Sequence, residues 1–427
     1  MKPTTLATVF VIALAASALA QQPPAGQPPQ GQAPAARPAP APRSAEVAPD
    51  GRVTFRVNAP KAAQVVLNGD WPGGRGLSMT KDPSGTWTLT TDPLAPEIWM
   101  YTLSIDGVTT LDPGNSRVLR DGVRRLNAVL VPGTGSALYQ VGKVPHGTVA
   151  AVWYPSPTLK TPRRMLVYTP AGYEGGTRKY PVLYLFHGGG GDEEAWNELG
   201  STSAIMDNLI AQGKAKPMIV VIPNANWNDT SILEPAGPRG QPAAPRGGQP
   251  AAPRGGQPGA APAMPAQDYS VAEREIVTGI IPYIEAHYRV LPGRENRAIA
   301  GLSMGGGISI NVGLKRLDVF ATVAQFSSGM FGGTGPAAGT GTGGGYPPFD
   351  IDKISPGFLK DAAATNKRLK LLYFSCGDDD PRMPFQKKVA DDFRNAKIAL
   401  TFKNYPGAHE WRVWRNSLAD VAGMLFQ

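Results

Sequence analysis

The segment around Ser303 constrains the fold of this chain more than any other. Gly301-Leu302-Ser303-Met304-Gly305 sets a serine between two glycines, directly after the short apolar run Ala298-Ile299-Ala300. This G-x-S-x-G pattern is typical of a sharp turn from a strand into a helix, in which the serine backbone is strained and its neighbours must lack bulk. In a chain with 51 glycines the pattern by itself does not identify a reactive serine. Its meaning depends on whether a strand precedes it and a helix follows it.

From about residue 145 onward, apolar runs that suit strands alternate with helical patterns. We expect strands at 165–168, 182–186, 218–222, 297–300, 320–324, 370–374 and 399–403, and helices at 203–212, 270–288, 304–315, 384–396 and 411–425. Such alternation predicts a mostly parallel sheet with helices on both faces. Ser303 then lies between a strand and a helix, as the motif requires.

Residues 46–132 have a different periodicity. Short alternating runs such as 53–57 and 64–67 are separated by turn pairs such as Asn68-Gly69 and Asp106-Gly107. This pattern predicts a small all-β, immunoglobulin-like sandwich. The expected organisation is therefore this sandwich followed by an α/β domain over 145–427.

The first twenty residues have the features of a secretory signal peptide. A lysine at position 2 precedes an apolar stretch over 6–16, and Ala18-Leu19-Ala20 forms an A-x-A cleavage site. The apolar stretch is shorter than a membrane-spanning helix needs, so we expect cleavage rather than a retained membrane anchor. The sequence thus predicts a secreted or periplasmic protein. The single cysteine, Cys376, rules out an internal disulfide.

Three segments are too biased in composition to build a core. Residues 21–45 are rich in Pro, Gln and Ala, which predicts a disordered linker, and the tracts at about 235–266 and 332–345 are expected to be disordered insertions in surface loops. Several arginines that contribute to the net charge of +9 lie in such tracts. With no nucleic-acid-binding motif in the chain, we expect no nucleic-acid partner.

A serine nucleophile needs a general base, and the chain has only four histidines. His146 precedes the first expected strand of the α/β domain, and His287 lies in an expected helix. His187 ends a strand and is followed by four glycines, which better suits an oxyanion loop. His409, in a loop between the last strand and the last helix, is left as the base.

The acid that orients this histidine is expected in Asp378-Asp379-Asp380, which follows the strand at 370–374. A carboxylate there emerges at the same edge of the sheet as Ser303, and the order Ser, Asp, His is the one that α/β-hydrolases use. Spacing does not distinguish the three aspartates. They could instead bind a cation, but no further ligand cluster is near in sequence, so we expect neither a metal nor a cofactor.

The oxyanion of the reaction is expected to be bound by two backbone amides. One belongs to Met304, the residue after the nucleophile, and the other to the turn His187-Gly188-Gly189, with Gly189 as the expected donor. A phosphate-binding glycine loop is the alternative for this turn. It is disfavoured because Asp192-Glu193-Glu194 follows the glycines where a lysine and a hydroxyl residue would be needed.

These residues together resemble the esterase D or feruloyl esterase-like family of α/β-hydrolases, carbohydrate esterase family 1, whose relatives include enterochelin esterases and mycolyltransferases. The resemblance covers about residues 145–427 and rests on the segments 187–193, 281–285, 288–290, 301–306 and 407–411. It implies an α/β-hydrolase fold. In that family the acid commonly closes a Cys-Gly-x-x-Asp stretch, which implies Asp380 here, with Asp379 as the second choice. The insertions depart from the family pattern.

The first domain resembles an early-set, CBM48-like sandwich, on the segments 55–60, 68–71 and 85–87. Trp71, Trp87 and Trp99 could stack on sugar rings of a polysaccharide, although core packing is the alternative for each. As residues that contact substrate we further name His187, Trp196 and Trp411.

The resulting expectation is a secreted serine esterase that removes feruloyl or acetyl groups from plant cell-wall polysaccharide such as arabinoxylan, by way of an acyl-enzyme. Its partner is then an ester-decorated polysaccharide or oligosaccharide. One alternative is a siderophore esterase of the enterochelin type. Another is a non-catalytic polysaccharide-binding protein on a hydrolase scaffold.

Overall fold

The computed structural model describes residues 43–227, 269–328 and 350–427. The predicted signal peptide, the linker up to residue 42 and both predicted insertions lie outside the described residues. Within those three described ranges, no helix combines the length and the apolar character needed to cross a membrane.

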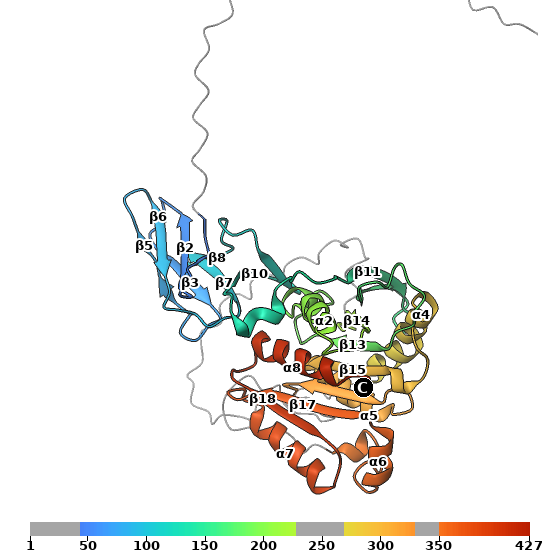
Figure 1. The fold of residues 1–427 in the computed structure, drawn as a ribbon. Helices are drawn as coiled ribbons and strands as arrows, with labels where there is room; N and C mark the ends of the chain where they lie inside the picture. The colour runs from blue at the N-terminus through green and yellow to red at the C-terminus, as the bar shows by residue number, and fades with distance from the viewer. Residues whose placement is uncertain (1–42, 228–268, 329–349) are drawn as a thin grey trace, which may run out of the picture. The chain divides into compact units, whose positions relative to one another are not determined.

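The N-terminal part is built only of strands (Figure 1). One sheet has the order β1 (Glu46–Val47), β2 (Val53–Asn58), β6 (Thr86–Thr90), β5 (Thr80–Lys81). The other has the order β4 (Leu77–Ser78), β3 (Val65–Gly69), β7 (Ile98–Ile105), β10 (Arg124–Leu130), β9 (Val118–Asp121), with β8 (Val108–Thr110) paired to β7. Alternate residues of β2 point into the shared core, as the period of a half-buried strand requires.

The first half of strand β7 is buried on both faces. Trp99, Tyr101 and Leu103 belong to the core of the sandwich. Ile98 and Met100, on the opposite face, belong to a core that also contains strands and helices of the C-terminal part. The two parts are therefore joined by a continuous apolar contact, to which β7, β10 and β9 contribute from the sandwich. A short helix, η1 (Thr134–Tyr139), links the parts along the chain.

The C-terminal part has an eight-stranded sheet with the order β11 (Thr148–Pro155), β12 (Pro162–Thr169), β14 (Ile219–Pro223), β13 (Val182–Phe186), β15 (Arg297–Leu302), β16 (Thr322–Phe326), β17 (Leu371–Gly377), β18 (Thr401–Tyr405). Strands from β14 to β18 are parallel, and β11 and β12 are antiparallel to their neighbours. The predicted mostly parallel sheet is confirmed.

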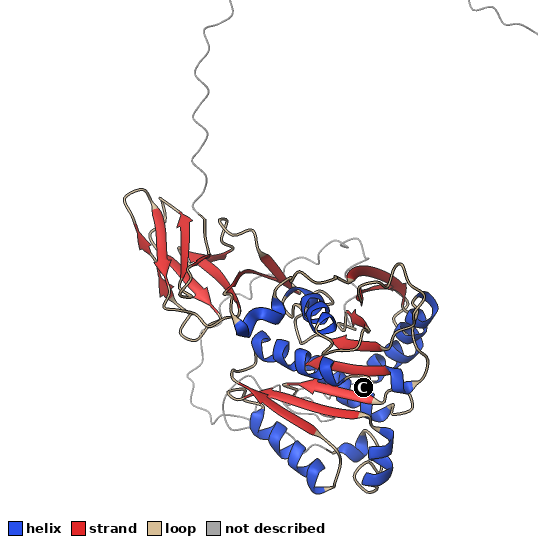
Figure 2. Cartoon of the chain, viewed as in Figure 1, coloured by secondary structure: helices blue, strands red, loops and turns tan. Residues whose placement is uncertain are grey.

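Helices cover both faces of this sheet (Figure 2). One face is covered by α3 (Ser270–Arg274), η2 (Glu275–Ile280), α4 (Ile281–His287), α5 (Met304–Lys315) and α7 (Met383–Asn395). The other is covered by α1 (Ala195–Glu198), α2 (Thr202–Ala211) and α8 (Trp411–Met424). Three smaller helices, η3 (Arg294–Asn296), η4 (Ile351–Lys353) and α6 (Ala362–Arg368), complete the described elements. The predicted fold class, an all-β sandwich before an α/β-hydrolase fold, is confirmed.

Two differences from the expected elements have physical reasons. Strand β11 has no counterpart among them, because it is an edge strand with exposed apolar residues such as Trp153, so its sequence lacks the pattern of a half-buried strand. The segment 270–288, expected as one helix, contains the π-helical turn η2. Glu275 at its start is fully buried and accepts a hydrogen bond from Ser156 at 2.7 Å. A single helical period in the sequence does not reveal such a turn.

Candidate active site

Ser303 lies at the turn between β15 and α5 with φ 50° and ψ −112°, a strained backbone for a residue with a side chain. Its amide donates to the carbonyl of Phe326 at 2.8 Å. A Cβ on Gly301 would lie 2.5 Å from the carbonyl of Gly305, and a Cβ on Gly305 would lie 2.3 Å from the carbonyl oxygen of Phe186. Both glycines are thus required by close backbone approach, and the turn has the geometry of a nucleophile elbow.

Asp380 and His409 come from neighbouring parallel strands and meet at the carboxyl edge of the sheet. Asp380 follows β17, and His409 follows β18. Oδ2 of Asp380 lies 2.8 Å from Nδ1 of His409, and Oδ1 accepts from the backbone amide of Arg382 at 3.0 Å. The carboxylate is buried, whereas Asp378 and Asp379 are exposed. Of the three candidates, the structure pairs Asp380 with the histidine.

The environment of Asp380 keeps it ionised. Burial alone would raise the pKa of this carboxyl. The hydrogen bond and the charge of His409, together with the amide and the charge of Arg382, outweigh burial and lower the pKa of Asp380 to about 2. An ionised Asp380 can hold the Nδ1 proton of His409, which leaves Nε2 free to accept a proton.

The loop that carries His409 is held against the end of β17. A Cβ on Gly377 would lie 2.3 Å from the carbonyl oxygen of Gly407, so only glycine fits there. The amide of Asp379 donates to the same oxygen at 2.9 Å. The imidazole ring of His409 packs edge-on against Trp414, with ring centroids 4.9 Å apart. These contacts determine where the imidazole lies relative to the sheet.

Ser303 and His409 line one cavity of about 670 Å³, which is within the usual range for a small-molecule site. Gly188, Gly189 and Trp411 line it as well. Among the residues that the structure describes, Ser303 and His409 share this cavity without a direct hydrogen bond, a common state of unliganded sites.

The glycine turn after β13 lies directly against the nucleophile elbow. A Cβ on Gly188 would lie 2.5 Å from Cδ1 of Leu302 and 3.5 Å from Cβ of Ser303. Gly189 faces open space. Met304 is the first residue of α5, where a backbone amide has no partner within the helix. Of the two residues expected to supply oxyanion donors, Met304 directly follows Ser303, and Gly189 lines the same cavity as Ser303.

His187 was expected to contact substrate, but the structure places its side chain in the core and not in the cavity lining. Its side chain is 0% exposed, and burial lowers the pKa of the imidazole, which favours the neutral form. Nε2 accepts from the amide of Ala225 at 2.9 Å, so the proton is on Nδ1, which donates to the carbonyl of Gly188 at 2.8 Å. From the core side, His187 therefore fixes the shape of the glycine turn that follows β13.

Trp196 and Trp71 were also expected to contact substrate, and the structure buries both. Trp196 donates from Nε1 to the carbonyl of Phe186 and packs edge-on against Trp411, with ring centroids 5.4 Å apart. Trp71 stacks on Phe55 in the sandwich core. Of the tryptophans named for substrate contact, only Trp411 lines the cavity.

The other two tryptophans considered for sugar binding are buried too. Trp87 donates from Nε1 to the carbonyl of Ala59 at 3.0 Å, and Trp99 donates from Nε1 to the carbonyl of Ala95 at 2.9 Å. Their indole groups are satisfied within the sandwich, as is usual for buried tryptophan. Core packing, the alternative considered for each, is the correct interpretation.

The sandwich nevertheless forms one wall of the cavity, which the sequence did not predict. Its polar contribution consists of Asn68, Asp70, Arg75, Thr102, Asp121 and Arg124. The C-terminal part contributes mainly glycine and apolar groups, such as Leu302, Trp411 and Trp414. No local pattern in a sandwich sequence indicates which loops will face another domain, so no signal for this wall was available.

Asp70 is the most perturbed carboxyl in this wall. Oδ1 accepts from the amide of Met100 at 2.8 Å. The pKa of Asp70 is raised to about 6, mainly by burial. The charge of Glu410 adds to this rise, whereas the hydrogen bond from the Met100 amide and the charge of Arg415 oppose it.

The chain matches the family model Esterase, described as "Putative esterase", over residues 156–425. It belongs to this esterase family. Over 389 residues it is 30% identical to an endo-1,4-beta-xylanase/feruloyl esterase of Xylanibacter ruminicola, which covers 88% of this chain and 45% of that protein. An esterase of Mycobacterium tuberculosis is 25% identical over 283 residues, 58% of this chain and 52% of that protein. The chain spans about half the length of these curated relatives.

Solved structures agree with this assignment. A ferulic acid esterase of carbohydrate esterase family 1 from Anaeromyces mucronatus, in complex with ferulic acid, is 26% identical with a TM-score of 0.50, over 67% of this chain and 93% of that one. The enterobactin esterase of Shigella flexneri has a TM-score of 0.59 at 15% identity, over 88% of this chain and 93% of that one. At that identity the second likeness shows the fold alone. The resemblance stated from the sequence motifs is confirmed at the level of the family.

Proposed function

We propose that the protein is a serine carboxylic-ester hydrolase in which Ser303, His409 and Asp380 act as nucleophile, general base and orienting acid. The observation that carries the proposal is the convergence of a strained elbow serine and a carboxylate-bound histidine on one cavity. Membership of the esterase family supports the same chemistry.

In this mechanism, Oγ of Ser303 attacks the ester carbonyl carbon while Nε2 of His409 takes its proton. The carbonyl oxygen becomes an oxyanion, which the amides of Met304 and Gly189 stabilise by hydrogen bonds. Collapse of this intermediate breaks the bond to the alcohol, which leaves with the proton from His409, and an acyl-enzyme remains. Water, activated by His409, then hydrolyses the acyl-enzyme and restores Ser303.

The proposed substrate is a feruloyl ester of a cell-wall polysaccharide such as arabinoxylan, with acetyl esters as the other acyl class. The feruloyl esterase names of the relatives support the acyl group. The lining of the cavity also fits the two parts of such a substrate, the aromatic acyl group and the sugar. Apolar side chains such as Leu302 and Trp411 suit an aromatic ring, whereas the polar sandwich wall suits the hydroxyls of a sugar.

Carbohydrate binding by the N-terminal domain is part of this proposal, but through a different surface from the one first expected. The buried tryptophans are replaced as candidates by Asp70, Arg75 and Arg124 on the cavity wall. Export is also part of the proposal, on the features of residues 1–20. The exported protein should begin close to Gln21, which N-terminal sequencing would establish.

A substrate panel tests the proposal. Methyl ferulate, p-nitrophenyl acetate, feruloylated arabinoxylan fragments and enterobactin are given to the wild type and to Ser303→Ala in parallel. We expect the wild type to release ferulate from the arabinoxylan fragments and Ser303→Ala to lose this activity. Faster hydrolysis of enterobactin than of any feruloyl ester would favour the siderophore alternative. Binding of polysaccharide without hydrolysis of any ester would favour the non-catalytic alternative.

A further inference from the structure

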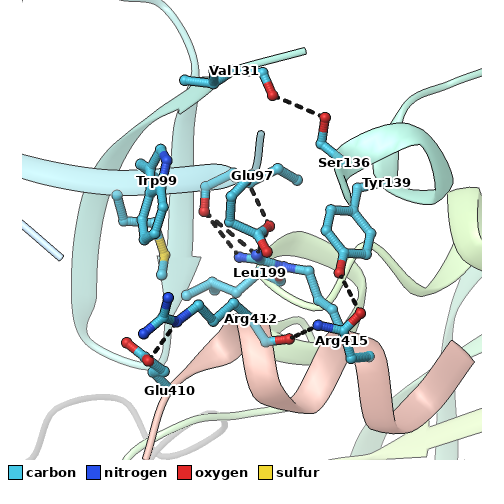
Figure 3. Close-up of polar contacts among 12 residues, drawn as sticks. Glu97, Trp99, Val131, Ser136, Tyr139, Leu199, Glu410, Arg412 and Arg415 are labelled. Carbon is cyan, nitrogen blue, oxygen red and sulfur yellow. Dashed lines mark hydrogen bonds and ion pairs between the residues drawn. The ribbon is translucent and has the colours of Figure 1, made fainter. Parts of the chain in front are cut away.

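A single buried cation connects the sandwich to the helix that begins beside the general base. Arg415, in the second turn of α8, has only 1% of its surface exposed. Its Nη1 donates to a carboxylate oxygen of Glu97, directly before β7, and Nη1 and Nη2 both approach the carbonyl of Ile98 at 3.4 Å (Figure 3). Its Nε donates to the carbonyl of Leu199 at 2.8 Å. The guanidinium thus bridges two parts of the fold that are far apart in sequence.

On the sandwich side, the carboxylate of Glu97 is also buried and hydrogen-bonded. Its side chain is 8% exposed, and its Oε1 accepts from the amide of Ile98 at 2.7 Å. Burial raises the pKa of Glu97, although the charge of Arg415 opposes the shift. The carboxylate therefore loses more by leaving water than it gains from its partners. Buried ion pairs of this kind contribute little net stability, and a role in fixing one arrangement is a reason to keep them.

The residues next to Arg415 belong to the candidate active site. Helix α8 begins at Trp411, two residues after His409. Trp411 and Trp414 line the cavity, and Trp414 carries the edge-on contact with the imidazole of His409. A change in the position of the first turn of α8 would therefore move the base relative to Ser303.

The contact of Arg415 with Leu199 connects the guanidinium to the region of the glycine turn after β13. Leu199 lines the cavity and directly follows α1, which carries Trp196. Trp196 in turn donates to the carbonyl of Phe186, just before the oxyanion turn. Arg415 is thus linked to the base through the first turn of α8, which carries Trp414, and to the end of β13 through Leu199 and Trp196.

A second contact reinforces the first turn of α8. Arg412 donates from Nε to Oε1 of Glu410 at 2.6 Å, and the same oxygen accepts from the amide of Ala408 at 2.9 Å. The guanidinium of Arg412 also lies 5.8 Å from the ring centroid of Trp99, in the sandwich. Ala408 and Glu410 flank His409 in sequence, so both ends of this short segment are held by contacts that lead to the sandwich.

We propose that Glu97 and Arg415 are positioning residues for ester hydrolysis, through which the sandwich fixes the first turn of α8, and with it His409, relative to Ser303 and the oxyanion turn. This inference rests on the proposed function. It assigns the sandwich a part in the chemical step, in addition to any binding of sugar. Hydrolysis of a small ester with no sugar should therefore also depend on the pair.

The test uses the full chain with methyl ferulate and p-nitrophenyl acetate. The variants are Glu97→Gln, which keeps a hydrogen-bond acceptor without the charge, and Arg415→Met, which removes all the donors. We expect kcat to fall about 10-fold in Glu97→Gln and about 100-fold in Arg415→Met, because small misplacements of catalytic groups reduce the rate of the chemical step. KM should change less than about 3-fold in both variants, since the groups that bind the substrate stay in place. The pH at which kcat/KM falls on the acid side should also shift, which a loss of stability alone would not cause.

Asp420→Asn is the matched control. Asp420 lies on the same helix and pairs with Lys403 at 2.6 Å, on a half-exposed surface. This variant also loses an ion pair of α8, yet it should keep the wild-type kcat and pH profile. If Arg415→Met does not fold, the double variant Glu97→Leu/Arg415→Met removes both buried charges together, a change that proteins often tolerate. It should fold and remain slow in kcat.

The outcomes separate this inference from the proposed function. A wild type that hydrolyses no ester would end the proposed function itself. Folded single variants, or a folded double variant, with wild-type kcat, KM and pH profile would overturn the positioning role while leaving the esterase proposal intact. A rise in KM at unchanged kcat would likewise overturn it, since it would limit the sandwich to binding substrate.

Discussion

Asp380 Oδ2 lies 2.8 Å from His409 Nδ1, and no other aspartate of its triplet is buried. Asp380→Asn should therefore lower kcat about 10²- to 10⁴-fold, because an amide can stabilise the wrong tautomer of the histidine and cannot stabilise its charged form. Asp379→Asn, at an exposed neighbouring carboxylate, is the control and should remain within about 2-fold of the wild type. The kcat of each variant is measured by hydrolysis of p-nitrophenyl acetate and compared with that of the wild type. Equal losses in the two variants would contradict the assignment of the acid.

Asp70→Asn is expected to stabilise the protein in a pH-dependent way. Burial raises the pKa of Asp70 to about 6, so the folded state binds this proton more tightly than the unfolded chain does. The free energy of unfolding should then fall as pH rises from about 4 through 6, by about 1–3 kcal/mol, because the folded state must ionise a partly buried carboxyl. The asparagine does not titrate. The difference in Tm between variant and wild type should be small at pH 4 and larger at pH 8, and a difference independent of pH would rule out this cause.

Gly305→Ala should destabilise the folded state through a steric clash. The added Cβ would lie 2.3 Å from the carbonyl oxygen of Phe186, which belongs to a fully buried strand and cannot move away. We expect a loss of more than about 3 kcal/mol in unfolding free energy, measured by denaturant titration. Gly189→Ala is the control, because open space surrounds its Cβ, and its loss should stay below about 1 kcal/mol. Similar losses at both positions would show that steric contact at the elbow is not the cause.

His187→Ala tests the corrected role of the buried histidine. The substitution leaves the amide of Ala225 and the carbonyl of Gly188 without the ring that connects them. We expect a loss of about 2–4 kcal/mol in stability, together with a lower kcat from the distorted oxyanion turn. A direct substrate contact would instead raise KM and leave the unfolding free energy unchanged, so Tm and Michaelis parameters measured on the same preparation distinguish the two.

Local chemistry explains what the sequence could predict. The strained turn at Ser303 was predictable because backbone strain and close approach restrict its neighbours to glycine. The histidine that pairs with a buried carboxylate, His409, was predictable because the chain has only four histidines. The spacing of three adjacent aspartates could not select among them. The family motif implied Asp380, and the structure pairs it with His409 because its position after β17 buries it while its neighbours remain exposed.

The errors and omissions concern contacts between distant segments. His187 and Trp196 lie in or near the glycine segment 188–191 in sequence, but their side chains point into the core. They hydrogen-bond the backbone carbonyls of Gly188 and Phe186 and so support the glycine turn. The polar sandwich wall and the Glu97–Arg415 pair depend on how two domains pack, and Glu97 and Arg415 are 318 positions apart in the chain. A pattern within one segment contains no information about such a pair.

The most direct test of the account is a serine-directed fluorophosphonate followed by intact mass and peptide mapping. The wild type should gain one adduct, located on Ser303, and lose its hydrolysis of methyl ferulate in parallel, while Ser303→Ala should gain none. A wild type that remains unlabelled and active, or an adduct on another serine that accompanies the loss of activity, would contradict the assignment of Ser303 as the nucleophile.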